Sequence, residues 1–240
     1  MKKGIIYYTD FHVSPFIQTN CLQQLDKSFD GEVISVSLNH PLSFGKNTVL
    51  EGERSNTMMI RQILTALWQS TADVVFFTEH DVLYNSTHFD FTPEKDNIFY
   101  YNLNNFRWDY PKDRAISYDG LTSLSQMCVY RKWALEHYEK RLKKIVDSGW
   151  DKEDGIGKLQ PVWVRMLGYE PGTKRRKIGG FSDDLSERWK SPLPNVDIRH
   201  NQTLSNPKTT LEAFKHLPTG WNETTLDKIP GWNLKEMFSL

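Results

Sequence analysis

Two carboxylates that directly follow a short apolar segment are the side chains best placed to do chemistry. The segment Val74–Thr78 runs straight into Glu79, His80 and Asp81. β-Branched and aromatic residues in so short a run predict a strand buried on both faces of a mostly parallel sheet, and functional groups gather at the carboxyl ends of such strands. In an extended segment Glu79 and Asp81 share one face while His80 points to the other, so the two carboxylates could hold a hard divalent cation. A solvated acidic loop is the alternative interpretation.

The first third of the chain contains the elements that would position these carboxylates. Strands are predicted at residues 4–9, 32–37 and 74–78, and the helices between them begin near Ser14-Pro15 and Thr57. The apolar side chains of each helix recur on one face: Ile17, Cys21, Leu25 and Phe29 in the first, and Ile60, Ile63, Leu64, Leu67 and Trp68 in the second. This β-α-β-α-β start predicts an α/β fold with a Rossmann-like, mostly parallel central sheet flanked by helices.

The remainder of the chain is less regular. Residues 39–56 read as a long polar connection. Further elements are predicted in this order: strands at 97–103, 115–118 and 125–130, an amphipathic helix at 131–146, an acidic turn at 151–154, a helix at 162–167 and a strand at 196–199. We predict a single domain over residues 1–205 and a C-terminal extension, residues 206–240, that packs on it through Trp221 and Trp232.

Composition limits the possible partners. The 240 residues include 30 Lys plus Arg and 30 Asp plus Glu, so contact with nucleic acid or a membrane would need a local basic patch. Cys21 and Cys128 lie far apart in apolar contexts, which predicts reduced core thiols and favours a cytoplasmic location. The amino terminus does not read as a signal peptide and no apolar stretch approaches membrane-spanning length, so no membrane partner is expected.

Three acidic or metal-competent positions occur in a recognisable order: Glu79-His80-Asp81 at a strand end, Glu153-Asp154 in a later turn, and His200 after the last strand. This order resembles the nucleotide-sugar glycosyltransferases of the GT-A fold, in which a D-x-D motif ends a central strand. The resemblance implies a Mn²⁺ or Mg²⁺ site at Asp81, Glu79 and His200, with Glu153 or Asp154 as the catalytic base that activates the acceptor. Because Glu replaces the first Asp of the motif, Asp81 is the better metal ligand.

Four segments carry a closer resemblance: residues 79–84 (EHDVLY), 88–93 (HFDFTP), 99–104 (FYYNLN) and 135–141 (LEHYEKR). Over roughly residues 50–205 they resemble the small glycosyltransferases related to the base J glucosyltransferase, also called TET/JBP-associated glycosyltransferases, many of which occur in phages. Membership would imply transfer of a sugar, commonly glucose from UDP-glucose, to the hydroxymethyl group of a modified pyrimidine in double-stranded DNA.

The donor nucleotide would bind at the ends of the first elements. Residues that end the first strand, lie before or within the second helix, or follow the strand at 74–78 are candidates for this role: Tyr8, Thr9, Asp10, Arg54, Asn56, Arg61, Gln62 and Glu79. The amino end of a helix beside an arginine suits a diphosphate. An ordinary loop carboxylate at Asp10 and a solvated charge at Arg61 are the alternatives.

The acceptor candidates fall into two groups. One is an aromatic and amide-rich segment, suited to stacking and to reading hydroxyls or base edges, with Tyr100, Asn102, Arg107 and Trp108. The other is a basic loop suited to a DNA backbone, with Lys174, Arg175, Arg176 and Lys177. For the aromatic segment, the alternative is a strand whose aromatic residues belong to the core. For the basic loop, the alternative is an ordinary solvated loop.

Two other classes of function stay open. The first is transfer to a polysaccharide or a lipid-linked saccharide. The second is a non-enzymatic nucleotide- or DNA-binding module, or a metal nuclease, although a nuclease would need more acidic residues at the first two strand ends than this chain has.

Overall fold

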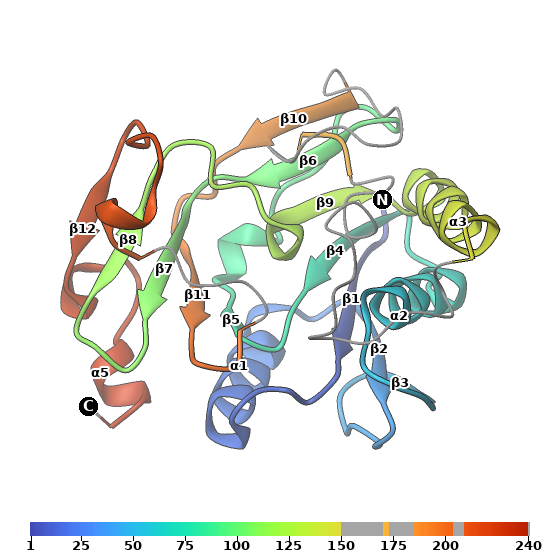
Figure 1. Cartoon of the computed structure of the whole chain (residues 1–240), viewed down its shortest axis with the longest axis horizontal. Helices are drawn as coiled ribbons and strands as arrows, with labels where there is room; N and C mark the ends of the chain where they lie inside the picture. The colour runs from blue at the N-terminus through green and yellow to red at the C-terminus, as the bar shows by residue number, and fades with distance from the viewer. Residues whose placement is uncertain (150–169, 173–184, 204–208, 240) are drawn as a thin grey trace.

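A seven-stranded, mostly parallel sheet forms the centre of the fold in a computed structural model that describes residues 1–149, 170–172, 185–203 and 209–239 (Figure 1). Its strands, in spatial order, are β10 (Ser186–Trp189), β6 (Phe99–Asn102), β9 (Met127–Tyr130), β4 (Val74–Thr78), β1 (Lys3–Thr9), β2 (Glu32–Leu38) and β3 (Lys46–Leu50). Strand β9 runs antiparallel to β4 and β6, and the other pairs are parallel. The predicted α/β class with its mostly parallel central sheet is confirmed.

Both faces of this sheet are buried because apolar side chains alternate along its central strands. Ile6 and Tyr8 of β1 belong to the core cluster shared with α2 (Asn56–Gln69) and α3 (Arg131–Asp147). Ile5 and Tyr7 belong to the cluster on the other face, which includes Leu25 of α1 (Pro15–Ser28). Helices on both faces fix the direction of the parallel strands, so the carboxyl ends of β1, β2 and β4 meet at one edge.

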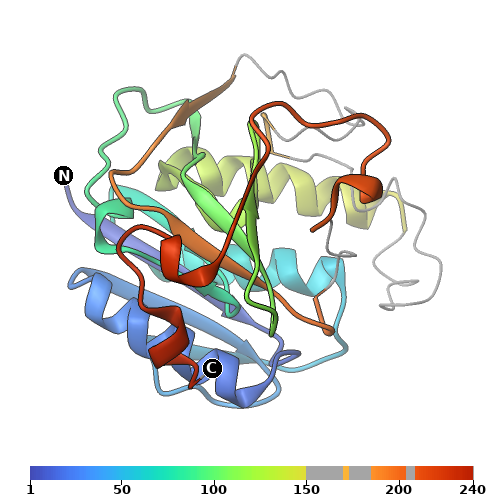
Figure 2. The same cartoon turned by 90° about the vertical axis from the view of Figure 1, so that its left-hand side faces the viewer.

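A second, five-stranded sheet lies beside the first, and Figure 2 is turned so that this side faces the viewer. Its order is β12 (Asn222–Thr224), β8 (Ala115–Ser117), β7 (Asn105–Asp109), β11 (Asn195–Arg199) and β5 (Val82–Leu83). Its central pair, β7 and β11, has one apolar face, with Phe106, Trp108, Val196 and Ile198 in a core cluster that includes Ile17 and Cys21 of α1. The alternate residues of the same two strands are polar, so this sheet presents a polar face beside the end of β4.

The C-terminal residues complete that apolar cluster. Leu226, Ile229, Leu234 and Phe238 contribute to it, the last two within or next to α5 (Leu234–Met237). The short 3₁₀ helices among the described residues are η1 (Ser86–His88), η2 (Leu124–Gln126), η5 (Leu211–Ala213) and η6 (Leu226–Lys228). None of the helices that the structure describes is long and apolar enough to cross a bilayer.

Several strands depart from the sequence prediction. The predicted connection 39–56 contains β3. The segment between the predicted strands at 97–103 and 115–118 contains β7. Strand β3 is partly exposed at the sheet edge, where an apolar run is not needed, and β7 is polar on one face. Strand β10 was also missed. The predicted acidic turn at 151–154, helix at 162–167 and basic loop at 174–177 lie outside the described residues.

Glu32, at the start of β2, makes hydrogen bonds with the loop between α2 and β4. Its carboxylate accepts hydrogen bonds from Lys2 Nζ at 2.8 Å, from Thr71 N and Oγ1 at 2.9 and 2.6 Å, and from Ser70 Oγ. Burial acts to raise the pKa of Glu32, but the hydrogen bonds from Lys2, Ser70 and Thr71 outweigh it and lower the pKa to about 2. This carboxylate therefore stabilises the fold above pH 4.5, and the contribution is lost as the pH falls toward 2.

We expect Glu32→Gln to lower the free energy of unfolding at pH 7 by about 1.5–3 kcal/mol, because charged hydrogen bonds are lost. The difference from the wild type should shrink at pH 3, because below pH 4.5 the unfolded chain takes up a proton at Glu32 that the folded protein binds only near pH 2. Urea unfolding at the two pH values measures both. Glu94→Gln, at an exposed position, serves as the control, and an equal loss at both pH values would contradict the assignment.

Candidate active site

Hydrogen bonds between side chains join the carboxyl ends of β1 and β4. Tyr7 pairs with Thr78 in the sheet, so the next residues of both strands lie side by side. Tyr8 donates its hydroxyl to Glu79 Oε1 at 2.6 Å, and Thr9 Oγ1 lies 2.8 Å from His80 Nδ1. Glu79 and His80 therefore point to different parts of this edge.

The loop after β1 is fixed by a second set of contacts around Asp10. Its carboxylate accepts a hydrogen bond from the backbone N–H of His12 at 2.9 Å, forms an ion pair with Arg54 Nε, and lies 3.9 Å from His80 Nδ1. Burial acts to raise the pKa of Asp10, but the Arg54 hydrogen bond and the His80 charge outweigh it and lower the pKa. Arg54 immediately precedes Ser55, which caps α2 by accepting from Met58 N at 2.9 Å. Asp10 is thus held beside the amino end of α2.

Asp81 and His200 form the third part of the site. The backbone N–H of Ile198 donates to Asp81 O at 2.8 Å, which brings the end of β11 next to Asp81. His200 Nε2 then lies 3.4 Å from Asp81 Oδ2, and both residues are buried. Burial acts to raise the pKa of Asp81, but the His200 hydrogen bond and the charges of His80 and Arg199 outweigh it and lower the pKa. Asp81 is therefore ionised at neutral pH.

Glu79 behaves in the opposite way. Burial, reinforced by the neighbouring charge of Asp81, raises the pKa of Glu79 to about 8, although the hydrogen bond from Tyr8 acts to lower it. Of the two carboxyl groups, only Asp81 carries a full negative charge at pH 7. Asp81 is therefore the anionic member of the motif, and its role as a metal ligand stays a prediction from the sequence.

The structure adds two charged residues that the sequence reading did not assign to the site. Asp197 and Arg199 lie on the polar face of β11, and Arg199 Nη1 is 3.2 Å from Asp197 Oδ1. Arg107, which is paired with Asp197 in the sheet, places its Nε 3.6 Å from Asp197 Oδ2. Burial acts to lower the pKa of Arg199, but the charges of Asp197, Asp81 and Glu79 raise it, so Arg199 is a buried cation next to the two motif carboxylates. The alternation of polar and apolar residues in β11 is the signal that could have identified them.

Asp81 and His200 could together supply two ligands to a divalent metal ion whose shell is completed by a substrate. Magnesium and manganese sites commonly use one or two carboxylates together with substrate phosphates and waters. Among the described residues, no three His, Cys, Asp or Glu side chains form a group that could hold a metal ion. His200 Nε2 is buried and faces Asp81 Oδ2 at 3.4 Å, while Nδ1 accepts from the backbone N–H of Gln202 at 3.2 Å. Because that bond places the ring proton on Nε2, ligation through Nε2 requires the Gln202 contact to break.

The remaining donor candidates lie on α2. Gln62 is buried and donates its amide to Thr9 O at 2.8 Å and to Val36 O at 3.2 Å, so it holds the ends of β1 and β2 together. Asn56 begins α2 near Arg54, and Arg61 is exposed one turn further along. Hydrogen bonds and ion pairs, two of them through His80, link five of the donor candidates: Tyr8, Thr9, Asp10, Arg54 and Glu79. Gln62 supports them from behind.

Three of the four aromatic and amide acceptor candidates lie in the core. Asn102 is buried with its amide 3.0 Å from His88 Nδ1, and the hydroxyl of buried Tyr100 accepts from Lys95 N at 3.0 Å. Trp108 is 0% exposed, so its ring cannot stack on a base. The prediction that both Arg107 and Trp108 contact the acceptor is wrong for Trp108, because adjacent side chains of a strand point to opposite faces. Arg107 alone reaches the polar face.

The remaining candidate residues lie in parts of the chain that the structure does not describe. Glu153 and Asp154, predicted as the catalytic base, and Lys174, Arg175, Arg176 and Lys177, predicted to contact DNA, lie outside the described residues. Their roles stay predictions from the sequence.

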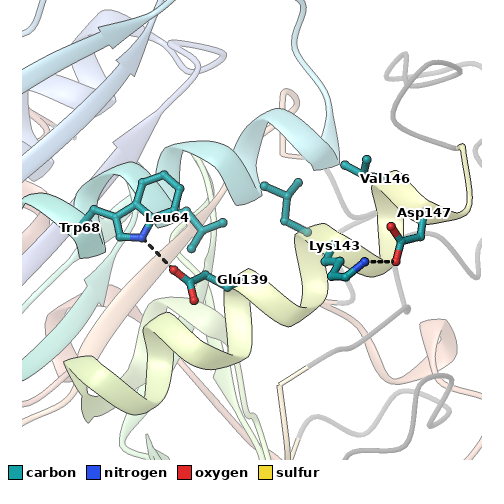
Figure 3. Close-up of a pocket in the computed structure, with 7 residues that line it drawn as sticks. Leu64, Trp68, Glu139, Lys143, Val146 and Asp147 are labelled. Atoms are coloured by element: carbon teal, nitrogen blue, oxygen red, sulfur yellow. Dashed lines mark hydrogen bonds and ion pairs between the residues drawn. The ribbon is translucent and has the colours of Figure 1, made fainter.

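A separate apolar groove lies between α2 and α3 (Figure 3). Leu64, Trp68, Leu142 and Val146 supply its apolar surface, and its polar groups pair with their neighbours: Trp68 Nε1 donates to Glu139 Oε1 at 3.0 Å. Trp68 lies in the last turn of α2, whereas the polar site is beside the first turn. The groove therefore takes no part in the site around Asp81.

No known protein family and no curated protein matches this sequence. Among solved structures, TarS 1–349 of S. aureus in complex with UDP-GlcNAc is similar over 84% of this chain and 59% of that chain, with 13% identity and a TM-score of 0.43. TarS 1–349 with UDP is similar over 55% and 47%, with 14% identity and a TM-score of 0.36. The glycosyltransferase GlyE of Streptococcus pneumoniae TIGR4, in its apo form, is similar over 64% and 39%, with 10% identity and a TM-score of 0.38. The chain thus spans less than two thirds of each of these proteins, and the likeness is remote.

Proposed function

We propose that this protein is a glycosyltransferase that uses a nucleotide-sugar donor, with the diphosphate bound between the loop after β1 and Asp81. The observation that supports the proposal most strongly is the convergence of three strand ends. Asp10 follows β1, Asp81 follows β4 and His200 follows β11, and each is linked to the others through His80 or a direct contact. Ligands of α/β sheets bind beyond the carboxyl ends of the strands, where these residues lie.

The charges of the site suit a diphosphate leaving group. Negative charge develops on the diphosphate as the sugar–oxygen bond breaks, and fixed cations and N–H donors lower the energy of that state. Buried Arg199 and the amino end of α2, next to Arg54, are available for this task. A divalent ion held by Asp81, with His200 beside it, would supply Lewis-acid stabilisation of the same charge when bound.

The finer proposal follows the resemblance to the base J-related family. In it, UDP-glucose is the donor, Mn²⁺ or Mg²⁺ is the metal, and the acceptor is the hydroxymethyl group of a modified pyrimidine in DNA, activated by Glu153 or Asp154. Arg107 and the basic loop 174–177 would hold the DNA backbone. Transfer to a saccharide is the second candidate, and the burial of Trp108 favours it, because the aromatic residue proposed to hold an extracted base is not accessible.

We expect Arg54→Ala to weaken UDP binding roughly 10- to 100-fold, the range of a lost charged hydrogen bond. Without Arg54, the negative charge of Asp10 would stand uncompensated beside the donor phosphates. Titration calorimetry with UDP and Mn²⁺ measures the change. Arg188→Ala is the matched control, since Arg188 is exposed on β10 at the opposite edge of the sheet. Equal affinities of the two variants would remove the loop after β1 from the donor site.

A further inference from the structure

Three half-exposed aromatic side chains gather where the C-terminal segment meets the second sheet. We call them the aromatic platform: Tyr118, Phe214 and Trp221. The rings of Tyr118 and Trp221 are nearly parallel, with an interplanar angle of 12° and centroids 6.1 Å apart. Phe214 packs edge-on against both, at 5.2 Å from Tyr118 and 5.8 Å from Trp221. The platform is thus a preformed aromatic surface of which no ring is fully buried.

The backbone around the platform is held in place by several contacts. Strand β12 pairs with β8, with Asn222 opposite Ser117, and Asp119 N donates to Thr219 O at 2.9 Å. Gly220 has a φ of +64°, and a Cβ there would lie 2.6 Å from the Asp119 carboxyl carbon. The carboxylate of Asp119 therefore packs directly against the residue that precedes Trp221. Aromatic faces next to a carboxylate form an arrangement able to stack on a ring and bind its hydroxyls.

Arg107 connects the platform to the candidate active site. Its Nη1 donates to Tyr118 Oη at 3.1 Å, its guanidinium carbon lies 5.8 Å from the centre of the Tyr118 ring, and its Nε lies 3.6 Å from Asp197. Asp197 in turn contacts Arg199, the buried cation beside Asp81. The platform and Asp81 thus lie at the two ends of one chain of polar contacts along the polar face of the second sheet.

The charge around the platform decides between ligand classes. Within residues 114–119 and 209–225 the acidic side chains are Asp119, Glu212 and Glu223, and the basic ones are Arg114 and Lys215. Arg107 of β7 adds one cation beside Tyr118, and this cation is paired with Asp197. Arg114 is engaged by Glu223 at 2.7 Å. This region has no excess of positive charge, so it does not suit a polyanion such as DNA. It suits a neutral ring with an apolar face.

We propose that the aromatic platform is the acceptor subsite and that it binds a neutral pyranose by stacking, with Asp119 as a hydroxyl acceptor. This inference rests on the proposed glycosyltransferase function and specifies its acceptor class. A pyranose presents C–H groups on one face, which pack on an aromatic ring, and hydroxyls at its rim, which a carboxylate binds.

The test is saturation-transfer NMR on the full chain with UDP and Mn²⁺, using the methyl β-glycosides of glucose, galactose and N-acetylglucosamine as probes. We expect saturation of the ring C–H protons of at least one probe. Trp221→Ala should weaken this binding roughly tenfold, and Trp221→Phe, which keeps a flat ring, should weaken it less. Asp119→Asn should weaken it without disturbing the packing. Trp68→Ala, a change at an exposed tryptophan on the α2–α3 side of the molecule, should leave binding unchanged (Figure 3).

The outcomes separate this inference from the proposed function. The UDP-induced rise in Tm reports the donor site and should be equal in the wild type and all four variants. A preserved rise without binding of any methyl glycoside would overturn the platform while leaving the donor site intact. The platform proposal would also be overturned if an oligonucleotide carrying 5-hydroxymethylcytosine bound to the wild type but not to Trp221→Ala, because the platform would then hold a base. Absence of the UDP-induced rise in the wild type contradicts the proposed function instead.

Discussion

Replacement of Asp81 by Asn is expected to abolish Mn²⁺-dependent UDP binding. Asp81 is the ionised carboxylate of the motif, since the pKa of Asp81 is lowered while that of Glu79 is raised to about 8. Loss of residues that only orient a metal ligand costs about 10- to 100-fold in affinity, so loss of the ligand itself should cost at least ~100-fold. Titration calorimetry with UDP, with and without Mn²⁺, measures this directly. The effect should vanish when the metal is omitted.

This loss should not reflect unfolding. Asp81→Asn keeps the shape of the side chain, and the buried Arg199 keeps its ion pair with Asp197. The variant should therefore keep a Tm within a few degrees of the wild type. Asp90→Asn, at an exposed position outside the site, is the control for the loss of one negative charge. Unchanged metal-dependent affinity in Asp81→Asn would show that this motif does not bind the metal.

Replacement of Arg141 by Met is expected to have the largest effect on stability. Arg141 Nη1 lies 2.6 Å from Glu170 Oε1, their side chains are only 3% and 2% exposed, and Tyr138 donates its hydroxyl to the same oxygen at 2.6 Å. Burial acts to raise the pKa of Glu170, but Arg141 outweighs it and lowers the pKa. Without Arg141 the carboxylate would be a buried charge without its cation, which costs about 3–5 kcal/mol.

Urea unfolding of three variants tests this explanation. Lys140→Met, at the preceding residue of α3, removes an exposed ion pair with Glu136 and should cost less than about 1 kcal/mol. The double variant Arg141→Met/Glu170→Met should regain much of the loss, because it removes both buried charges together. A double variant as unstable as Arg141→Met would show that the arginine stem, and not its charge, stabilises this part of the fold.

The strands with apolar side chains on both faces could be predicted from the sequence, and those with one polar face could not. The run Val74–Thr78 needs burial on both sides, so its residue types alone identify β4 and the position of Glu79 and Asp81. Strand β3 lies at an edge, and β7 faces polar residues on one side, so neither has the apolar run that marks a strand. The second sheet, and with it the orientation of Trp108, followed from pairings between residues about ninety positions apart, which local patterns do not encode.

The candidate site was foreseen where it depends on strand ends. The residues after β1 and β4 had to meet because parallel strands end at one edge, and Asp10, Arg54 and Glu79 do lie there. Asp197 and Arg199 were missed because their role depends on β11 joining β5 and β7, which places their side chains beside Asp81. The aromatic platform likewise requires β12 to pair with β8.

The release of UDP from UDP-glucose tests the central claim most directly. The wild-type protein should form UDP slowly from UDP-glucose and Mn²⁺ alone, because water can replace the acceptor, and EDTA should stop the reaction. Asp81→Asn should release none, while Asp90→Asn should match the wild type. If no UDP is formed from UDP-glucose or UDP-GlcNAc, and neither donor binds to the wild type in the presence of Mn²⁺, the residues around Asp81 do not form the donor site of a glycosyltransferase.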